Sequence, residues 1–112
     1  MYYTAKQVQK ILGITSIQYS NLINRKHLVC SFPAGDGPKG VSHKYSKEDM
    51  IRNMILIELM FCGINRTESS EIAHELGKNM DRDIKVKLNP IIHLVINGRR
   101  LCERLKNYDE QN

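Results

Sequence analysis

The sequence predicts a mainly α fold with a small β part, an α+β protein, and three observations support this prediction. Four segments within the first 68 residues have the pattern of a helix start. The stretch 32–40 is rich in glycine and proline, which interrupts regular structure after the second of these segments. Residues 84–88 alternate strictly between apolar and basic side chains, which is typical of a half-buried strand. We therefore expect five helices and four short strands.

Each predicted helix start pairs two polar side chains three residues apart. The first can accept the free amides of the opening turn, and the second can reach back to the preceding backbone. The four pairs are Thr4 with Gln7, Thr15 with Gln18, Ser46 with Asp49, and Asn65 with Glu68. Gly13 and Gly63 follow apolar runs and predict helix ends. The predicted helices are therefore 5–12, 16–25, 47–62 and about 66–78.

The first two predicted helices are separated only by residues 13–15, and a turn this short forces them to cross steeply. Seven apolar residues at helical spacing would form a small core there: Val8, Ile11, Leu12, Ile14, Tyr19, Leu22 and Ile23. This is the geometry of a helix-turn-helix. The segments 28–30 and 41–45 predict two short strands that hold the glycine-rich loop as a wing. The third helix is apolar nearly all round, so we expect it to be buried within the domain or against a second subunit.

The C-terminal part predicts a β-hairpin and a helix. After the strand 84–88, the turn Asn89-Pro90 leads into the apolar run 91–96. Asn97 can cap a last amphipathic helix whose apolar face contains Leu101, Leu105 and Tyr108. An alternative interpretation continues one helix from Asp83 to Tyr108, although Pro90 and Gly98 argue against it. We therefore expect a winged helix-turn-helix domain in 1–78, followed by a hairpin and helix in 79–112 that extend the same compact unit.

Charge is distributed unevenly along the 112 residues, whose net charge is +5. Residues 1–47 hold seven basic residues and one acidic residue, whereas the rest of the chain holds ten and eleven. Such an asymmetry is expected when one segment binds a polyanion, although a merely solvated face is the alternative.

Several other classes of protein are not indicated. Cys30, Cys62 and Cys102 fit neither a disulfide framework nor paired zinc ligands, so we expect reduced thiols in a cytoplasmic protein. No signal-peptide pattern is present, and the apolar stretch 54–64 is too short to span a membrane. Glu71 and His74 lack the second histidine of a zinc-hydrolase helix, and no catalytic or phosphate-binding motif is evident. We therefore expect no enzyme activity, no metal, no cofactor and no small-molecule effector.

The outward face of the second helix supplies the candidate binding residues. If Tyr19, Leu22 and Ile23 are buried, the opposite side meets solvent or the major groove of DNA. Asparagine and glutamine pair with adenine, arginine pairs with guanine, and an apolar side chain packs on the thymine methyl. The basic residues of the wing would meet phosphates. The candidate DNA-binding residues are Thr15, Ile17, Gln18, Ser20, Asn21, Asn24 and Arg25 in the helix, and Lys39, His43 and Lys44 in the wing.

Four segments together resemble the DNA-binding domain of the MerR family. They are Tyr3-Thr-Ala-Lys-Gln-Val-Gln-Lys-Ile-Leu-Gly-Ile-Thr15, Arg25-Lys-His-Leu-Val29, His43-Lys-Tyr-Ser-Lys-Glu-Asp-Met50 and Ile57-Glu-Leu-Met-Phe-Cys-Gly-Ile64. The resemblance covers about 2–76 and implies that helix 16–25 enters the major groove while the wing touches the backbone or minor groove. It departs at Ile17 and Ser20, where the family has basic residues, and after residue 76, where the family has a long dimerisation helix.

The function expected from these observations is sequence-specific binding of double-stranded DNA by a transcription regulator, through a recognition helix at 16–25 and a wing at 30–45. The alternatives are an excisionase-like or segregation accessory factor, and a protein-interaction module that retains the fold. We also expect a homodimer held by 79–112, because an isolated hairpin is only marginally stable in water. Packing of the hairpin on its own chain is the alternative.

Overall fold

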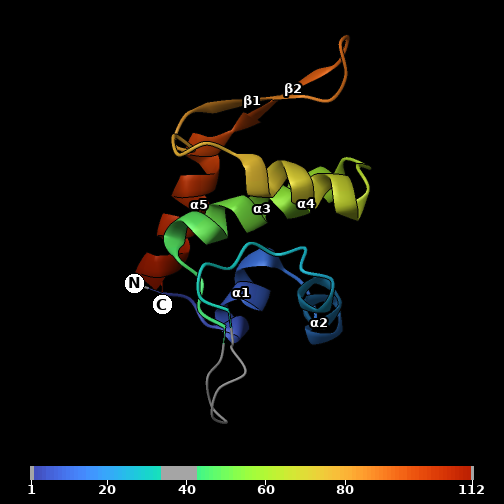
Figure 1. Ribbon diagram of the computed structural model, residues 1–112. Helices are drawn as coiled ribbons and strands as arrows, with labels where there is room; N and C mark the ends of the chain where they lie inside the picture. The colour runs from blue at the N-terminus through green and yellow to red at the C-terminus, as the bar shows by residue number, and fades with distance from the viewer. Residues whose placement is uncertain (1, 34–42, 112) are drawn as a thin grey trace.

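The structure is a computed structural model that describes residues 2–33 and 43–111, and Figure 1 shows its arrangement. A central helix crosses the middle of the molecule, with two helices below it, two beside and above it, and an antiparallel hairpin at the top. This confirms a mixed α+β protein. The elements of the described residues are α1 (Ala5–Leu12), α2 (Ser16–Asn24), α3 (Lys47–Phe61), α4 (Arg66–Glu75), β1 (Asp83–Lys87), β2 (His93–Asn97) and α5 (Gly98–Gln111).

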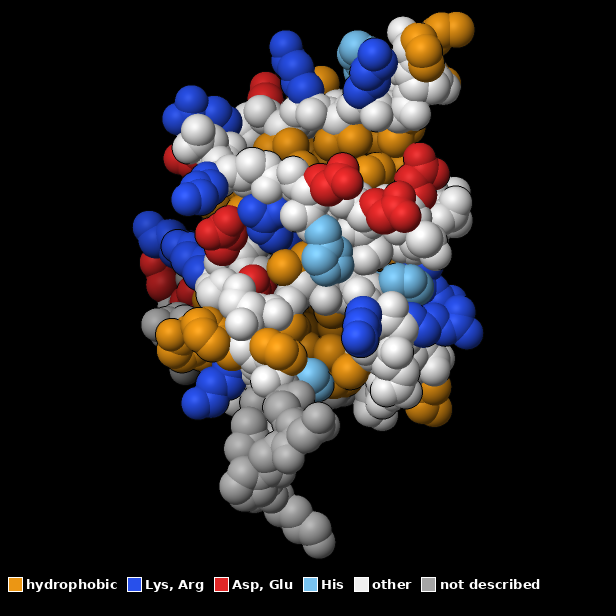
Figure 2. All heavy atoms as spheres, in the orientation of Figure 1, with side chains coloured by type: hydrophobic (Ala, Val, Ile, Leu, Met, Phe, Trp, Pro, Cys, Tyr) orange, Lys and Arg blue, Asp and Glu red, His pale blue; other side chains and the backbone are white. Residues whose placement is uncertain are grey.

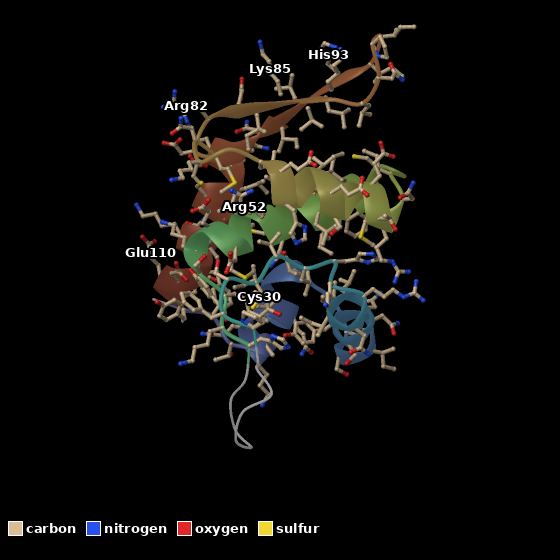
Figure 3. The ribbon with its side chains drawn as sticks, viewed as in Figure 1. Cys30, Arg52, Arg82, Lys85, His93 and Glu110 are labelled. Atoms are coloured by element: carbon tan, nitrogen blue, oxygen red, sulfur yellow. The ribbon has the colours of Figure 1, made fainter. Side chains whose placement is uncertain are left out.

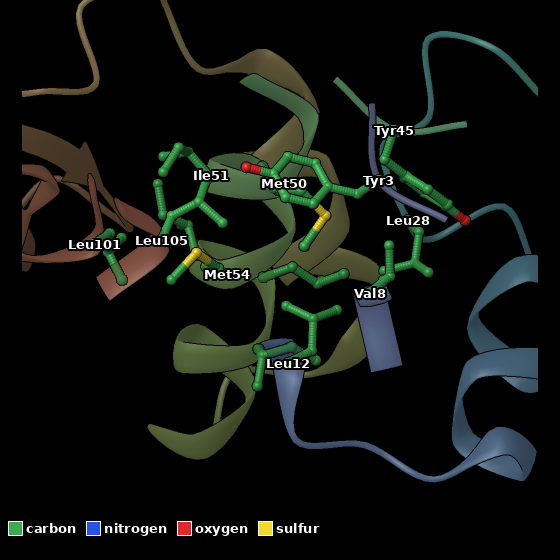
Figure 4. Packing of buried hydrophobic residues seen from close by; sticks show 14 of the residues in the cluster. Tyr3, Val8, Leu12, Leu28, Tyr45, Met50, Ile51, Met54, Leu101 and Leu105 are labelled. Carbon is green, nitrogen blue, oxygen red and sulfur yellow. The ribbon is translucent and has the colours of Figure 1, made fainter. Parts of the chain in front are cut away.

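Helix α3 is buried on several sides, as its all-round apolar sequence predicts. Nine of its fifteen residues are buried, and α1, α4 and α5 all pack against it. Figure 4 shows Leu101 and Leu105 of α5 beside Ile51 and Met54, with Leu12 of α1 on another side. The two coverings expected for this helix were its own domain or a second subunit. Here its own chain provides the cover.

The helix starts follow the predicted capping patterns. Thr4, Thr15 and Ser46 each form a reciprocal capping box, whereas Asn65 accepts a single hydrogen bond from the backbone N–H of Glu68. Helix α4 ends at Glu75, three residues earlier than predicted, because Leu76 is extended with ψ 142°. The guanidinium of Arg52 donates to the carbonyl oxygens of Ala73 and His74, at 3.1 and 3.3 Å, and so stabilises that earlier end.

The predicted wing is present only as paired backbone at its base. Instead of two strands, the described residues form isolated bridges between Phe32 and Lys44 and between Tyr3 and Tyr45. Phe32, which the sequence placed in the loop, therefore takes part in this pairing. Residues 34–42, including most of the predicted loop, Lys39 and the start of the predicted strand 41–45, lie outside the described residues.

The C-terminal segment forms the predicted hairpin and helix. The alternative prediction, one continuous helix from Asp83 to Tyr108, is wrong. The strands pair antiparallel from Asp83 opposite Asn97 to Lys87 opposite His93. The side chain of Asn97 then caps α5 by accepting from the N–H of Arg100 at 3.1 Å. Gly98 opens the helix because a β-carbon there would overlap the carbonyl oxygens of Met80 and Arg82.

Helix α5 joins the two ends of the chain. The hydroxyl of Tyr3 donates to both carboxylate oxygens of Asp109 at 2.9 Å, and the ammonium of Lys10 lies 5.8 Å from the centre of the Tyr108 ring. One hydrophobic cluster includes residues from α1 through α5. The segment 79–112 therefore packs on the N-terminal part of its own chain.

Candidate nucleic-acid interface

Helix α2 is fixed to the body by its inward face. Tyr19 and Leu22 are buried, and Ile23 is half-buried, as the sequence predicts. The hydroxyl oxygens of Tyr19 and Tyr45 lie 2.7 Å apart and share a buried hydrogen bond. Because Tyr45 is also paired with Tyr3 through two backbone hydrogen bonds of 2.8 and 3.0 Å, α2 is tied directly to the base of the predicted wing.

The opposite face of α2 is open to solvent. Ile17, a β-branched apolar side chain, is 73% exposed and lies within this face. The other predicted contact residues of the helix are also exposed: Thr15, Gln18, Ser20, Asn21, Asn24 and Arg25. These residues and Ile17 form one exposed face of α2, which is polar except for Ile17 and which we call the polar stripe.

Two of the predicted contact residues are already engaged with each other. The side-chain oxygen of Gln18 accepts from the N–H of Thr15 at 2.8 Å, and the hydroxyl oxygen of Thr15 accepts from the N–H of Gln18 at 3.1 Å. A bidentate contact from Gln18 to adenine needs both its oxygen and its amide group, so adenine would compete with the N–H of Thr15 for this oxygen. Among the described residues, the side chains of Asn21, Asn24 and Arg25 make no hydrogen bond, so these predicted contact residues of α2 have their amide and guanidinium groups available.

The base of the predicted wing places His43 and Lys44 next to each other. Lys44 is exposed, and its N–H donates to the carbonyl of Phe32 at 2.9 Å. His43 is half-buried, with its Nδ1 3.9 Å from the sulfur of Cys30. Figure 1 shows this base and α2 at the same end of the molecule. Lys39 lies outside the described residues, so its position relative to these groups is not part of the geometry.

Sequence reasoning missed the two buried polar residues that hold the segment after α2. The side chain of Asn53, completely buried, accepts from the N–H of Val29 at 2.7 Å and donates to its carbonyl at 3.0 Å. The carboxylate of Asp49 accepts from the N–H and hydroxyl of Ser31 at 2.9 and 2.7 Å. Both project from α3, and they position the chain that leads to the wing. Only the polarity of these positions in an otherwise apolar helix signals them in the sequence.

The basic residues of the N-terminal part are not all on one face. The ammonium of Lys10 lies over the ring of Tyr108 in α5. Lys26, which was not among the predicted contacts, is exposed at the end of α2. It lines a hollow of about 640 Å³ together with His43, which brings a second basic side chain to the gap between α2 and the wing base.

Burial keeps the tyrosine hydroxyls near α2 uncharged. Burial raises the pKa of Tyr45, and its hydrogen bond and Coulomb interaction with Tyr19 raise it further. Burial also raises the pKa of Tyr19 and of Tyr3. Burial, followed by the positive charges of Arg66 and Arg25, lowers the pKa of His27 immediately after α2. His27 therefore contributes less positive charge to this end than an exposed histidine would.

Comparison with known proteins found no matching protein-family model and no curated protein of significant sequence similarity. Within 2–33 and 43–111, no helix is both long enough and apolar enough to cross a membrane. The same residues contain no group of three or more histidine, cysteine or acidic side chains suited to a metal ion. All three cysteines are free.

Proposed function

We propose that this chain is a sequence-specific duplex DNA-binding protein that regulates transcription. The observation that carries the proposal is the uncovered polar stripe of α2, a helix anchored by Tyr19 and therefore able to present that stripe rigidly. An α-helix fits the major groove, where each base pair has a distinct pattern of donors and acceptors. The resemblance to the MerR family supports the same docking, with 30–45 on the backbone or minor groove.

Each contact has a separate chemical role in this proposal. Asn21 and Asn24 pair with adenine, Arg25 pairs with guanine, and Ile17 packs on a thymine methyl. Lys26, His43 and Lys44 contact phosphates, which fix orientation without reading sequence. The helix therefore determines which site is bound, and the wing base determines how tightly any site is held.

Salt-dependent binding is the first test. Gel-shift titrations of the full chain should show that affinity for duplex DNA falls by about one to several orders of magnitude between low and moderate salt, because bound lysines release counterions. Lys44→Ala should reduce both the affinity and the slope of this dependence. Lys106→Ala, which removes an exposed lysine from α5, is the matched control and should change neither. Absence of duplex binding at low salt contradicts the proposal.

Transcription regulation and a recombination or segregation role use the same DNA contacts, so a functional readout must separate them. A promoter fused to a reporter and carrying the bound site should change its output when the chain is produced. Unchanged output together with altered recombination or segregation of a plasmid carrying the site assigns the accessory role instead.

A protein-interaction module is the second candidate, and an apolar hollow favours it. Residues of the turn between α1 and α2 and of the end of α3 line a space of about 260 Å³, and Phe61 beside it is 81% exposed. Exposed apolar patches of this kind often bind other proteins. If α2 carries the function, Phe61→Ala should leave DNA binding and regulation of the reporter unchanged. If the chain instead acts by binding another protein through the hollow, Phe61→Ala should abolish its effect on the reporter.

We also propose that the chain acts as a homodimer through the hairpin. The described sheet has two strands, so each strand has one edge whose backbone groups have no neighbouring strand. Edge pairing of two copies would satisfy these groups and present two recognition helices to one DNA site. Sedimentation of the full chain at micromolar concentration should give the mass of a dimer, and a monomer at that concentration contradicts this arrangement.

A further inference from the structure

The hairpin of β1 and β2 lies at the opposite end of the molecule from α2, along a long axis of 49 Å. Its inner face covers the end of α3: Val86 is buried, and Ile84, Leu94 and Ile96 are half-buried. The pairing of Lys85 with Val95 and of Lys87 with His93 places these four on the other face, and all are exposed. Figure 3 shows Lys85 and His93 pointing away from the body.

This outer face and its surroundings are positively charged. Residues 78–100 contain six basic and two acidic residues, whereas 48–77 contain two and six. Lys85 and Lys87 take part in none of the ion pairs found among the described residues. Figure 2 shows basic side chains along the top of the molecule and acidic ones below them, at the level of α4. On this face of the molecule, the acidic side chains of α4 therefore lie between the basic hairpin and the end that holds α2.

The tip of the hairpin is apolar and is closed by hydrogen bonds to one side chain. Ile91 is 90% exposed, the highest value among the exposed large apolar residues of the described chain. The side-chain oxygen of Asn89 accepts from the N–H groups of Ile91 and Ile92, at 2.8 and 2.7 Å. β-Ribbons can read DNA grooves, and proteins that enter the minor groove often insert proline or isoleucine between base steps. Pro90 and Ile91 have that chemistry.

We propose that the outer face of the hairpin binds the phosphate backbone of a second DNA duplex, with the tip at Pro90–Ile91 entering a groove. Charge complementarity identifies the occupant: Lys85 and Lys87 form no ion pair among the described residues and outnumber Asp83, the acidic residue that shares their face of β1. Val95 is the exposed large apolar side chain of this face. A lipid surface fits less well, because apolar exposure is otherwise confined to the tip. The chain then holds two duplexes, one at each end. Binding of the first duplex rests on the function proposed for α2.

A bridging assay on the full chain tests this inference. The chain is bound to a duplex on beads, and a fluorescent duplex of unrelated sequence is added. The wild-type chain should retain the fluorescent duplex. The variant Lys85→Glu/Lys87→Glu should still bind the bead duplex but should retain about tenfold less of the fluorescent duplex, or even less. The variant Lys85→Gln/Lys87→Gln should lower the salt dependence of fluorescent-duplex binding, measured as the slope of log affinity against log salt concentration, by about two. Lys106→Glu, on an exposed lysine of α5, is the control and should retain the second duplex.

The outcomes separate this inference from the function proposed for α2. A wild-type chain that binds the bead duplex but recruits no second duplex overturns the inference alone, and so does unchanged retention by both hairpin variants with native circular dichroism. If the hairpin variants lose the bead duplex while Asn21→Ala/Arg25→Ala keeps it, the hairpin binds DNA and α2 does not. Binding to phosphatidylserine vesicles that depends on Ile91, without a second duplex, assigns the face to a lipid surface and overturns the inference.

Discussion

Asn53 connects the central helix α3 to the segment that follows α2. Its carboxamide is completely buried and satisfies both backbone groups of Val29. Asp49, one turn earlier in α3, holds Ser31 and also closes the capping box with Ser46. These side chains act as a fixed template for residues 29–31, which lead to the wing.

Replacing Asn53 by alanine should therefore destabilise the fold. The change leaves the N–H and carbonyl of Val29 without partners beside a buried cavity, and we expect a loss of about 2–4 kcal/mol in the free energy of unfolding. Urea denaturation followed by circular dichroism measures it. Asn107→Ala, at an exposed asparagine of α5, is the control and should change stability by about 0.5 kcal/mol or less. A loss as small as that of the control contradicts the proposed role of Asn53.

His27 makes stability depend on pH. Its Nδ1 is buried without a hydrogen-bond partner among the described residues, and burial lowers its pKa below the ordinary 6.5. Arg66, Arg25 and His74 add in the same direction. As the pH falls past about 6.5, the unfolded chain binds a proton at His27 before the folded chain does. The contribution of His27 to the free energy of unfolding is therefore fully present above this pH and is lost as the pH falls below it.

The variant His27→Gln should lose less stability on acidification than the wild type. Urea denaturation at about pH 7.5 and about pH 5.5 gives the difference for each chain, and the smaller acid loss of the variant isolates the contribution of His27. His93→Gln, on the exposed face of β2, controls for removal of a histidine. Equal acid losses in wild type and His27→Gln would show that this histidine does not carry the effect.

At the scale of elements, the end of α2 is unusual. Lys26 has φ 56°, in the left-handed region that favours glycine. The N–H groups of Lys26 and His27 donate to the carbonyls of Ile23 and Leu22, at 3.0 and 2.9 Å, which is the pattern of a Schellman end. Gly13 and Gly63 occupy the same position after α1 and α3, with φ 68° and 92°. Within 2–33 and 43–111, Lys26 is the one residue other than glycine with a positive φ.

Lys26→Gly should relieve that backbone strain and weaken DNA binding. We expect the free energy of unfolding to rise by about 0.5–1 kcal/mol, because glycine adopts the left-handed conformation without steric cost. Removing a basic side chain beside His43 should at the same time lower affinity for all duplexes alike. Thermal unfolding and gel shifts on the same preparation measure both. A variant less stable than the wild type contradicts this account of the helix end.

The elements that the sequence predicted well are those with local signals. The helix starts at Thr4, Thr15 and Ser46 depend on residues three positions apart, and the strand alternation depends on neighbours. The features it missed depend on distant partners. Asn53 meets Val29, Tyr3 meets Asp109, and Arg52 ends α4, none of which can be inferred from spacing along the chain.

For the site, the sequence predicted the face of α2 but missed two properties. The oxygen of Gln18 is used by the same capping box that predicted the helix, so one residue received two roles that conflict. The charge was counted only before and after residue 47. The acidic segment 48–77 and the basic segment 78–100 therefore cancelled, and the basic segment was missed. Lys39 and the rest of 34–42 lie outside the described residues, so their predicted contacts stay predictions.

At the scale of the whole molecule, α5 holds the C-terminal segment against the central helix and the N-terminal residues. Leu105 is completely buried within the cluster that surrounds α3, and Asp109 accepts from the hydroxyl of Tyr3. The apolar face predicted for the last helix thus packs against the central helix. The outer edges of the two hairpin strands have no neighbouring strand among the described residues and are available for the proposed pairing with a second copy of the chain.

Leu105→Ala tests this fastening. Truncating a fully buried leucine should lower the free energy of unfolding by about 2–5 kcal/mol, measured by urea denaturation. Val95→Ala removes an exposed side chain of β2 and should cost far less. If Leu105→Ala is as stable as the wild type, α5 does not pack on α3 as described.

The most direct test of the account is selection of bound duplexes from a random DNA library by the full chain and by three variants. The wild-type chain should enrich one sequence motif. Asn21→Ala and Arg25→Ala should relax it at particular base pairs, at a cost of about 1–3 kcal/mol each, whereas Lys44→Ala should keep the motif and weaken every sequence equally. An absence of any enriched motif, or a motif that changes with Lys44→Ala but not with the α2 variants, would contradict the assignment of α2 as the recognition helix.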